Sequence, residues 1–448
     1  MTPAEALAAL RAAEARDGAI PVEERCDHLA RLADTLLARS EDIAAAVDAD
    51  YGGRSRMDTL LADVVCTADA AHYSRRHLRR WARPRRVSVP FPFWPASAHE
   101  VPTPKGVVGI MSPWNYPVQL ALWPAVDAIA AGNRVALKPS ERTPRTASLL
   151  AEIAETALGP GIARTVLGGP DVAAEFAAQP WDHLVFTGGT ETGRKVAEAA
   201  ARNLVPVTLE LGGKCPAVVL PGAELGRAAR DILAGKAVNA GQTCVAPDTV
   251  LLVGHTPDAF RAACVAAGIG APEGGLATDS AAERLDRLTA GLPAHALTPP
   301  GEGRRRALFL VEAPPDSGLS REEIFGPVLA LTPVPDLAAA IAWIAARPPP
   351  LAIYLFGATR AEAAAVAAGT RSGAVVSGRA VEYVAFPSLG FGGVGASGTG
   401  RYHGLRGFEE FSNLRASIRH GEWSLSRLFD PPRGKFAQRL ISRLAKIR

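Results

Sequence analysis

Hydrophobic residues recur along the first eighty positions with the spacing of helices. Leu29, Leu32, Leu36 and Leu37 lie at helical spacing between charged positions, which indicates an amphipathic helix with one buried face. The same pattern continues to about Trp81. The next stretch predicts an extended arm or linker, because closely spaced prolines exclude a helix. These prolines are Pro84, Pro90, Pro92, Pro95, Pro102 and Pro104.

From residue 106 onwards, short apolar runs alternate with helix-like segments. The apolar runs predict strands at 106–112, 134–138, 162–167 and 183–187. The segments between and after them predict helices at 120–131, 143–158, 172–179 and 190–202. Alternation of this kind is typical of a parallel sheet with helices on both faces.

A second series of strands and helices begins near Val207 and predicts a second α/β unit. Its strands are expected at 206–211, 216–220, 248–253, 351–357 and 373–377. Its clearest helices are expected at 224–239 and 361–368. The pattern therefore predicts an α/β fold with two open sheets.

Composition places the chain among ordinary globular proteins. It has 448 residues, of which 48% are hydrophobic and 21% are charged, close to the average for folded domains. A net charge of +4 is small for this length, so a dedicated nucleic-acid-binding protein is not indicated. For the same reason, the arginine cluster at 75–86 fits a solvated helix face better than a nucleic-acid surface.

The cysteines and the N-terminal residues indicate a reducing compartment. Five cysteines without a C-x-x-C pair predict neither a disulfide framework nor a zinc site. Glu5 and Glu14 lie among the first alanines, and no apolar core of a signal peptide is visible there. The longest uncharged stretch, 106–126, is interrupted by prolines, which argues against a membrane-spanning helix. We therefore expect a cytoplasmic protein.

Cys244 and Glu210 are candidates for chemistry. Cys244 lies in the run N-A-G-Q-T-C-V-A-P, where small and polar neighbours let a backbone amide approach a substrate. A cysteine there is a nucleophile if its thiolate is stabilised, and otherwise a small buried side chain. Glu210 lies in an otherwise apolar strand. Burial there would raise its pKa toward that of a general base, whereas an outward-facing side chain would be inert.

Further candidates follow the predicted strands of the first sheet. Asn115 comes just after the first strand, at the edge where open α/β sheets bind ligands. Its amide either donates to an oxyanion or forms a turn. The run F-T-G-G-T-E-T-G, with Gly188 and Gly193, leaves amides free at a helix N-terminus, which suits a pyrophosphate. Lys138 and Glu141 end the second strand, where a ribose hydroxyl can be reached.

Taken together, these motifs resemble those of the aldehyde dehydrogenase superfamily. Cys244 and Glu210 are 34 residues apart, as the family expects. GQTCVAPD, and YHG followed by GFEEFSNLR, are most similar to the class 3 branch, which includes fatty, aromatic and coniferyl aldehyde dehydrogenases. The motifs follow the family's order between about residues 20 and 420: PWNYP, LKPSE, FTGGTETG, LELGGK, GQTCVAPD, EEIFGPV and FGGVGASGTGRYHG.

The resemblance implies two open, Rossmann-like α/β domains and extended arms that join subunits. It assigns residues 1–83 and 103–207 to a dinucleotide-binding domain and residues 208–385 to a catalytic domain. Residues 84–102 and 386–448 would form the bridging and oligomerisation arms, including the basic C-terminal tail. The expected assembly is a homodimer.

The resemblance also implies a role for each candidate residue. Cys244 would attack the aldehyde carbonyl as a thiolate, while the amide of Asn115 and the backbone N–H of Cys244 hold the oxyanion. Loss of hydride from the thiohemiacetal would give a thioester, and Glu210 would activate the water that hydrolyses it. No metal is implied. The residues expected to bind the dinucleotide are Trp114, Lys138, Glu141, Gly188, Gly193, Glu323 and Phe325.

The implied reaction is the NAD(P)-dependent oxidation of an apolar or aromatic aldehyde to its carboxylic acid. Glu141 can accept a hydrogen bond from a 2′-hydroxyl but would repel a 2′-phosphate, which favours NAD. Class 3 relatives often accept both cofactors, so NADP stays open. Two alternatives remain, a cysteine-dependent esterase without nicotinamide and a catalytically degenerate binding protein. The intact set of Cys244, Glu210 and Asn115 argues against degeneration.

The chain departs from the family pattern near the expected substrate mouth. Residues 268–310 are shorter and richer in proline and glycine, and Ser377 and Gly378 replace the Asn-Asp pair of class 3, so the aldehyde stays unassigned. The tail at 435–448 predicts a basic amphipathic helix. Such a helix docks on its own subunit or its twin, or else contacts a membrane surface, but it is too short to span a bilayer.

Overall fold

The first of three sheets has six strands, in the order β15-β7-β6-β3-β4-β5. The computed structural model describes residues 1–299, 301–314 and 317–446. All neighbouring strands of this sheet are parallel except β15, which pairs antiparallel with β7. The strands are β3 (Val107–Met111), β4 (Arg134–Lys138), β5 (Ala163–Thr165), β6 (His183–Gly188), β7 (Val207–Leu211) and β15 (Gly398–Thr399).

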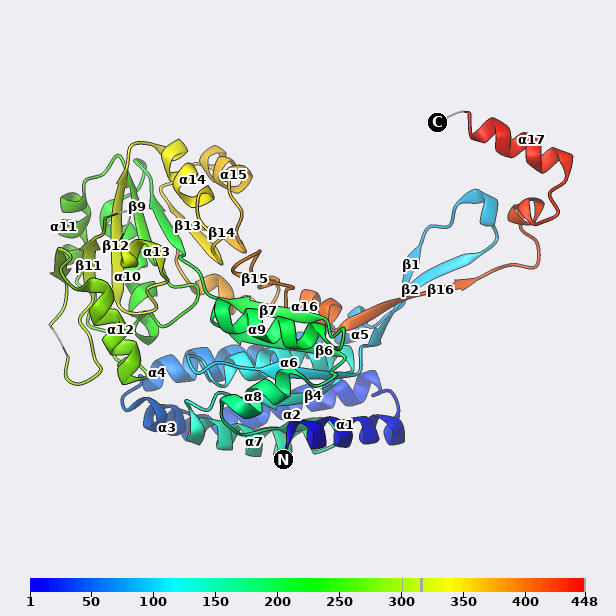
Figure 1. The fold of residues 1–448 in the computed structure, drawn as a ribbon, viewed down its shortest axis with the longest axis horizontal. Coiled ribbons are helices and arrows are strands. Elements are labelled where there is room, and N and C mark those ends of the chain that lie inside the picture. The colour runs from blue at the N-terminus through cyan, green and yellow to red at the C-terminus, as the bar shows by residue number, and fades with distance from the viewer. Residues whose placement is uncertain (300, 315–316, 447–448) are drawn as a thin grey trace.

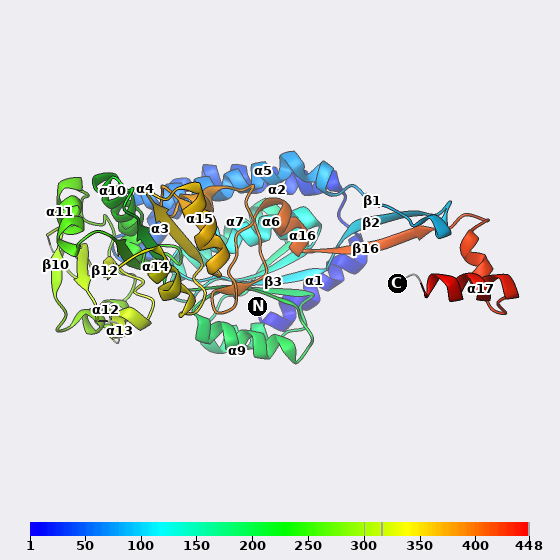
Figure 2. The same cartoon turned by 90° about the horizontal axis from the view of Figure 1, so that it is seen from above.

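Helices cover both faces of this sheet (Figure 2), because successive side chains of a strand point to opposite faces. Ile110 and Leu137 pack into one core together with helices α2 (Val22–Ala38), α3 (Ser40–Tyr51), α5 (Cys66–Trp81), α6 (Gln119–Ala131) and α7 (Pro144–Leu158). Val107 and Ala136 pack into a second core with α1 (Pro3–Asp17), α8 (Pro170–Ala177) and α9 (Thr190–Ala201). Between α3 and α5 lie α4 (Arg56–Asp58) and the π-helical turn η1 (Thr59–Val65).

The second sheet has seven strands, in the order β10-β11-β12-β9-β8-β13-β14. Within the described ranges, β10 pairs antiparallel with β11, and the other neighbouring strands of this sheet are parallel. The strands are β8 (Pro216–Val219), β9 (Thr249–Val253), β10 (Ala294–Ala296), β11 (Phe309–Glu312), β12 (Val328–Val334), β13 (Ala352–Phe356) and β14 (Ala374–Ser377). Its helices are α10 (Leu225–Ala237), α11 (Pro257–Ala267), α12 (Asp279–Thr289), α13 (Gly318–Arg321), α14 (Leu337–Ala345) and α15 (Arg360–Gly369).

The third sheet is a narrow antiparallel arm that projects from the body (Figure 1). It consists of β1 (Arg85–Val87), β2 (Ser97–Pro104) and β16 (Ser412–Arg419). The last strand follows α16 (Gly404–Glu410). Beyond the tip of the arm lies the C-terminal helix α17 (Lys435–Leu444). Among the described residues, no helix combines the length and the apolar character needed to cross a bilayer.

The predicted α/β architecture is confirmed, with one difference in strand grouping. The sequence pattern groups the strand at 206–211 with the second series. However, β7 pairs in parallel with β6 and therefore belongs to the six-stranded sheet. Side-chain periodicity identifies a strand but not its hydrogen-bonded neighbour. The sequence pattern therefore could not assign β7 to one of the two sheets. Because β7 pairs with β6, Glu210 is presented by the first sheet, while Cys244 lies in the loop before β9 of the second.

Candidate active site

The candidate site lies at the carboxyl ends of the parallel strands. From β3 the chain adds β4 and β5 on one side and β6 and β7 on the other. The crevice between β3 and β6 is thus a topological switch point, where open α/β sheets bind ligands. Trp114 and Asn115 follow β3, and Gly188 ends β6. The fold therefore brings three of the predicted site residues to one edge.

Asn115 is held by hydrogen bonds to two other parts of the chain, residues 51–54 and 239–242. Its carbonyl oxygen accepts bonds from Arg54 Nη1 at 2.6 Å, Asn239 Nδ2 at 3.0 Å and the Tyr51 hydroxyl at 3.1 Å. Its side-chain Nδ2 donates to the carbonyl of Gln242 at 3.1 Å. Because Gln242 lies two residues before Cys244, these bonds tie the candidate oxyanion donor to the loop of the candidate nucleophile.

Arg54, which donates to the carbonyl of Asn115, also belongs to a buried ion pair that the sequence pattern did not identify. The side chains of Arg54 and Asp63 are fully buried, with Arg54 Nη2 and Asp63 Oδ2 3.5 Å apart. The other oxygen of Asp63 accepts the backbone N–H groups of Val118 at 3.0 Å and Gln119 at 3.1 Å. Asp63 therefore satisfies free amides at the start of α6, where a helix lacks internal acceptors.

The loop before Cys244 has an unusual backbone. Asn239 and Ala240 have φ values of 49° and 51°, in the left-handed region that non-glycine residues seldom occupy. The buried side chain of Gln242 stabilises this loop. Its Nε2 donates to the carbonyls of Asn239 at 3.0 Å and Gly275 at 3.2 Å, and its Oε1 accepts the N–H of Ala277 at 2.8 Å.

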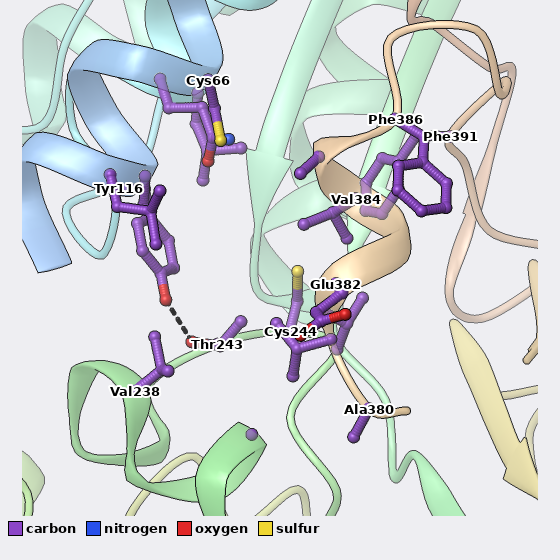
Figure 3. A pocket seen from close by; sticks show the side chains of 18 of the residues that line it. Cys66, Tyr116, Val238, Thr243, Cys244, Ala380, Glu382, Val384, Phe386 and Phe391 are labelled. Atoms are coloured by element: carbon purple, nitrogen blue, oxygen red, sulfur yellow. Dashed lines mark hydrogen bonds between the residues drawn. The ribbon is translucent and has the colours of Figure 1, made fainter. Parts of the chain in front are cut away.

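Cys244 lines a predominantly apolar cavity of about 470 Å³. Figure 3 shows its sulfur directed into the cavity, with Tyr116 on one side and Phe386 and Phe391 on the other. The Tyr116 hydroxyl is 2.6 Å from Oγ1 of Thr243, so one polar wall is already hydrogen-bonded. An apolar aldehyde in this space can bring its carbonyl carbon to the sulfur.

Burial and negative charge dominate the electrostatics around the sulfur. Burial raises the pKa of Cys244 well above its usual value, and Glu323, Cys215 and Glu210 raise it further. Glu210 is only 3% exposed, and neither of its carboxylate oxygens has a hydrogen-bond partner in the described part of the chain. Burial raises the pKa of Glu210 well above its usual value. Both groups therefore tend to hold a proton near neutrality.

A second cavity, of about 590 Å³, has the features of a dinucleotide site. It is lined by Thr190 at the start of α9, by Gly212 and by Glu323. No side chain caps α9, which leaves backbone amides for phosphate oxygens. A Cβ at Gly212 would lie 2.0 Å from Glu323 Oε2, so only glycine admits this carboxylate. A Cβ at Gly193 would lie 2.5 Å from Leu211. These residues fit a bound dinucleotide.

Other predicted cofactor residues lie at the same edge of the two sheets. The rings of Trp114 and Phe325 meet edge to face with centroids 5.6 Å apart. Phe325 has a φ of 47°, and its segment is tied down by Lys214, which donates to the carbonyl of Glu322 at 2.8 Å. Burial and then Asp248 raise the pKa of Glu323 to about 7.

Lys138 and Glu141 lie apart from this cavity, at the end of β4. Lys138 is buried and donates from Nζ to the carbonyl of Pro139 at 2.9 Å. Burial lowers the pKa of Lys138. Glu141 is exposed, with one oxygen 4.0 Å from Lys138 Nζ. Because β4 neighbours β3, both residues lie at the same edge of the sheet as Trp114 and Asn115.

Comparisons with known proteins identify the class of protein that carries this site. A family model described as "Aldehyde dehydrogenase family" matches residues 1–417. A probable coniferyl aldehyde dehydrogenase from Pseudomonas aeruginosa is 39% identical, covering 94% of this chain and 91% of the relative. Aldehyde dehydrogenase family 3 member A2 from Rattus norvegicus is 34% identical, covering 92% and 88%. A solved structure described as the substrate-bound state of Staphylococcus aureus AldH matches with a TM-score of 0.91 and 28% identity, over 99% of both chains.

The chain therefore belongs to the aldehyde dehydrogenase family. It is an NAD(P)-dependent aldehyde dehydrogenase that is similar to members of the class 3 branch. The resemblance inferred from the motifs is confirmed.

The buried ion pair generates a stability prediction. We expect Arg54→Met to lower the free energy of unfolding by about 3–5 kcal/mol, because it leaves Asp63 buried without its cation. Urea denaturation followed by circular dichroism measures this loss. Arg56→Met is the matched control, since Arg56 and Glu41 form an exposed pair, and should cost less than about 1 kcal/mol. Equal stabilities of the two variants would contradict the role of Arg54.

The charge of Glu323 generates a second prediction. With a pKa of about 7, Glu323 is increasingly ionised above neutral pH, where its charge opposes the thiolate of Cys244. We expect Glu323→Gln to lower the pKa of Cys244, because it removes a negative charge that opposes the thiolate. Alkylation of the apoenzyme by iodoacetamide would then begin at a lower pH. Glu191→Gln, at an exposed acid of the same cavity, should leave the profile unchanged. An unshifted profile in Glu323→Gln would refute this coupling.

Proposed function

We propose that Cys244, Glu210 and Asn115 catalyse the oxidation of an apolar or aromatic aldehyde to its free acid. The observation that carries this proposal is the position of the Cys244 sulfur. It lies in the wall of an apolar cavity and is electrostatically coupled to a buried carboxylate, Glu210, that has no hydrogen-bond partner in the described chain. A buried carboxylate without a partner lowers the stability of the fold. Groups of this kind are found chiefly at functional sites, where they transfer protons.

The residues divide the chemistry into two steps. Cys244 loses its proton to solvent water and attacks the carbonyl carbon as a thiolate, which forms the thiohemiacetal oxyanion. The Asn115 amide and the Cys244 N–H donate to the oxyanion, and such a donor contributes on the order of 10²–10³ in rate. A bound nicotinamide would supply the acceptor for the hydride that leaves the thiohemiacetal carbon, so that a thioester of Cys244 remains. Glu210 then takes a proton from water as the water attacks the thioester, and the carboxylic acid leaves with release of the thiol.

The shape of the substrate cavity supports an apolar or aromatic aldehyde. Its lining includes Phe386, Phe391, Val384 and Leu120. The charged side chains that also line it, Asp231, Arg379 and Glu382, pair with one another, so the cavity offers little compensation for a charged substrate. The names of similar proteins agree with this substrate class, since they include a coniferyl aldehyde dehydrogenase and a 4,4′-diaponeurosporen-aldehyde dehydrogenase.

Both sheets contribute residues to the proposed dinucleotide site. We assign the dinucleotide to the six-stranded sheet with residues Trp114, Lys138, Glu141, Gly188 and Gly193. Glu323 and Phe325 would complete that site from the seven-stranded sheet, which also presents Cys244. The exposed carboxylate of Glu141 favours NAD, because it repels a 2′-phosphate.

We further propose that the projecting arm joins two copies of the chain. It exposes large apolar side chains, including Phe91, Trp94 and Ile418, and an exposed apolar patch of this kind marks an interaction site. Sedimentation equilibrium should give twice the monomer mass, and a monomer at micromolar concentration would contradict this assembly.

The assigned roles generate a kinetic prediction. We expect Cys244→Ala to lower turnover more than about a thousandfold while cofactor binding, measured by fluorescence titration, is retained. Glu210→Gln should still give a burst of about one reduced cofactor per subunit, followed by steady-state turnover slowed about 10²–10⁴-fold. Cys264→Ala, on α11, is the matched control and should turn over normally. Normal turnover of either active-site variant would refute the roles.

A further inference from the structure

The segment 322–325, which carries two of the proposed cofactor residues, is fixed by charged side chains from outside it. It lies between α13 and β12 and is neither helix nor strand. The carbonyl of Glu322 accepts a hydrogen bond from Lys214 Nζ at 2.8 Å, and the N–H of Ile324 donates to Asp248 Oδ2 at 2.7 Å. Lys214 and Asp248 also form an ion pair with each other, so one pair holds this backbone at two points.

A third charged side chain, Arg284 of α12, holds the same segment. Its Nη2 donates to the carbonyls of Glu323 at 2.8 Å and Ile324 at 3.1 Å. Its Nη1 is buried and has no hydrogen-bond partner in the part of the chain that the structure describes, although buried N–H groups are normally paired. Arg284 lies within residues 268–310, where the chain departs from the family pattern, so no motif indicated it.

Apolar side chains place α12 directly against this segment. Ala282 and Leu285 lie three residues apart on α12, hence on one face of the helix, and they pack with Ile324 in one buried cluster. A Cβ at Gly326 would lie 3.0 Å from Leu285, so the helix touches the backbone that follows the segment. This packing fixes the position from which Arg284 donates to the two carbonyls.

The end of the segment also contacts the loop of the nucleophile. A Cβ at Gly241 would lie 2.3 Å from the carbonyl oxygen of Gly326, and Gly241 has a φ of 72°. Only glycine permits so close an approach in this conformation. Gly241 lies three residues before Cys244. A shift of the segment would therefore disturb both the cofactor residues and the loop that carries the sulfur.

The charge of Arg284 acts on the carboxyl group of Glu323. Burial and then Asp248 raise the pKa of Glu323 to about 7, while the N–H of Gly213, Arg284 and Lys214 oppose this rise. Arg284 therefore favours the ionised carboxylate, which is a stronger hydrogen-bond acceptor for hydroxyl groups than the neutral acid. The charged and titratable groups around Glu323 are Asp248, Lys214, Arg284, Lys236, Cys215 and Cys244.

We propose that Arg284 is a positioning residue for cofactor binding, which fixes the segment 322–325 so that the Glu323 carboxylate lines the dinucleotide cavity in its charged form. Without Arg284 the segment is less ordered, and NAD has to order it on binding, which lowers affinity. This assignment rests on the proposed function, because it takes Glu323 as a residue of the cofactor site.

Calorimetric titration of the enzyme with NAD, in the absence of aldehyde, provides the first test. Because ionised Glu323 is the better acceptor, the affinity for NAD should rise as the pH increases through about 7 and then level off. Glu323→Gln should remove this rise. An affinity that does not change with pH in the wild type, or a rise that persists in Glu323→Gln, would overturn the place of Glu323 in the proposed cofactor site.

The variant Arg284→Met tests the positioning role itself. We expect it to weaken NAD binding about fivefold or more and to move the rise in affinity to higher pH, because a neighbouring cation no longer favours the carboxylate. Arg287→Met, at an exposed position of the same helix, is the matched control and should keep the affinity and pH dependence of wild type. Absence of either effect in Arg284→Met overturns this inference and leaves the proposed function intact.

The variant Arg284→Gln carries the test if Arg284→Met does not fold, which circular dichroism establishes. Its amide can still donate to a carbonyl of the segment but has no charge. The rise in NAD affinity should therefore again move to higher pH. A rise at the same pH as in the wild type overturns the inference.

Discussion

The carbonyl oxygen of Asn115 accepts hydrogen bonds from Tyr51 and Arg54 and from Asn239, which lie in two segments that are far apart in the sequence. This cluster joins the N-terminal helices, the end of β3 and the loop before Cys244. The amide of Asn115 adds a fourth bond, to the carbonyl of Gln242. Positions of reacting groups must be accurate to a fraction of an ångström for efficient catalysis. The cluster provides that accuracy where two sheets meet.

Burial of the site also makes the ionisation of its acidic groups costly. Burial raises the pKa of both Cys244 and Glu210, so a thiolate and an ionised base are costly in this environment. Glu323 increases the cost through its negative charge. Burial therefore favours the neutral thiol and the neutral carboxyl group, and each group must be deprotonated before it acts. A general base with a raised pKa, such as Glu210, is suited to this order of steps, because it accepts a proton readily when water attacks the thioester.

Local patterns predicted much of this structure, and long-range contacts account for the remainder. Alternating apolar runs and amphipathic segments located the strands of the six-stranded sheet except β15, and β8, β9, β13 and β14 of the other sheet, because burial of one face imposes a period on the sequence. The pattern did not predict β10, β11 and β12 or the helices α11, α12 and α14. The candidate residues lie in short motifs at strand ends, where position alone suggests function. The partner of β7 depends on hydrogen bonds between separate strands. Arg54 and Asp63 carry no motif, and their only signal is charge within a largely buried helical region. Tyr116 and Gln242 lie inside recognised motifs, but their bonds to neighbouring loops do not follow from spacing.

The central claim is that the acyl group of the substrate becomes attached to Cys244. The most direct test is mass spectrometry of Glu210→Gln protein that has been mixed with cinnamaldehyde and NAD and then quenched in acid. The account predicts an increase in mass equal to the cinnamoyl group in place of the thiol hydrogen, and peptide mapping should assign it to Cys244. An acyl group on a different residue, or product formed without any acylated protein, would contradict the account.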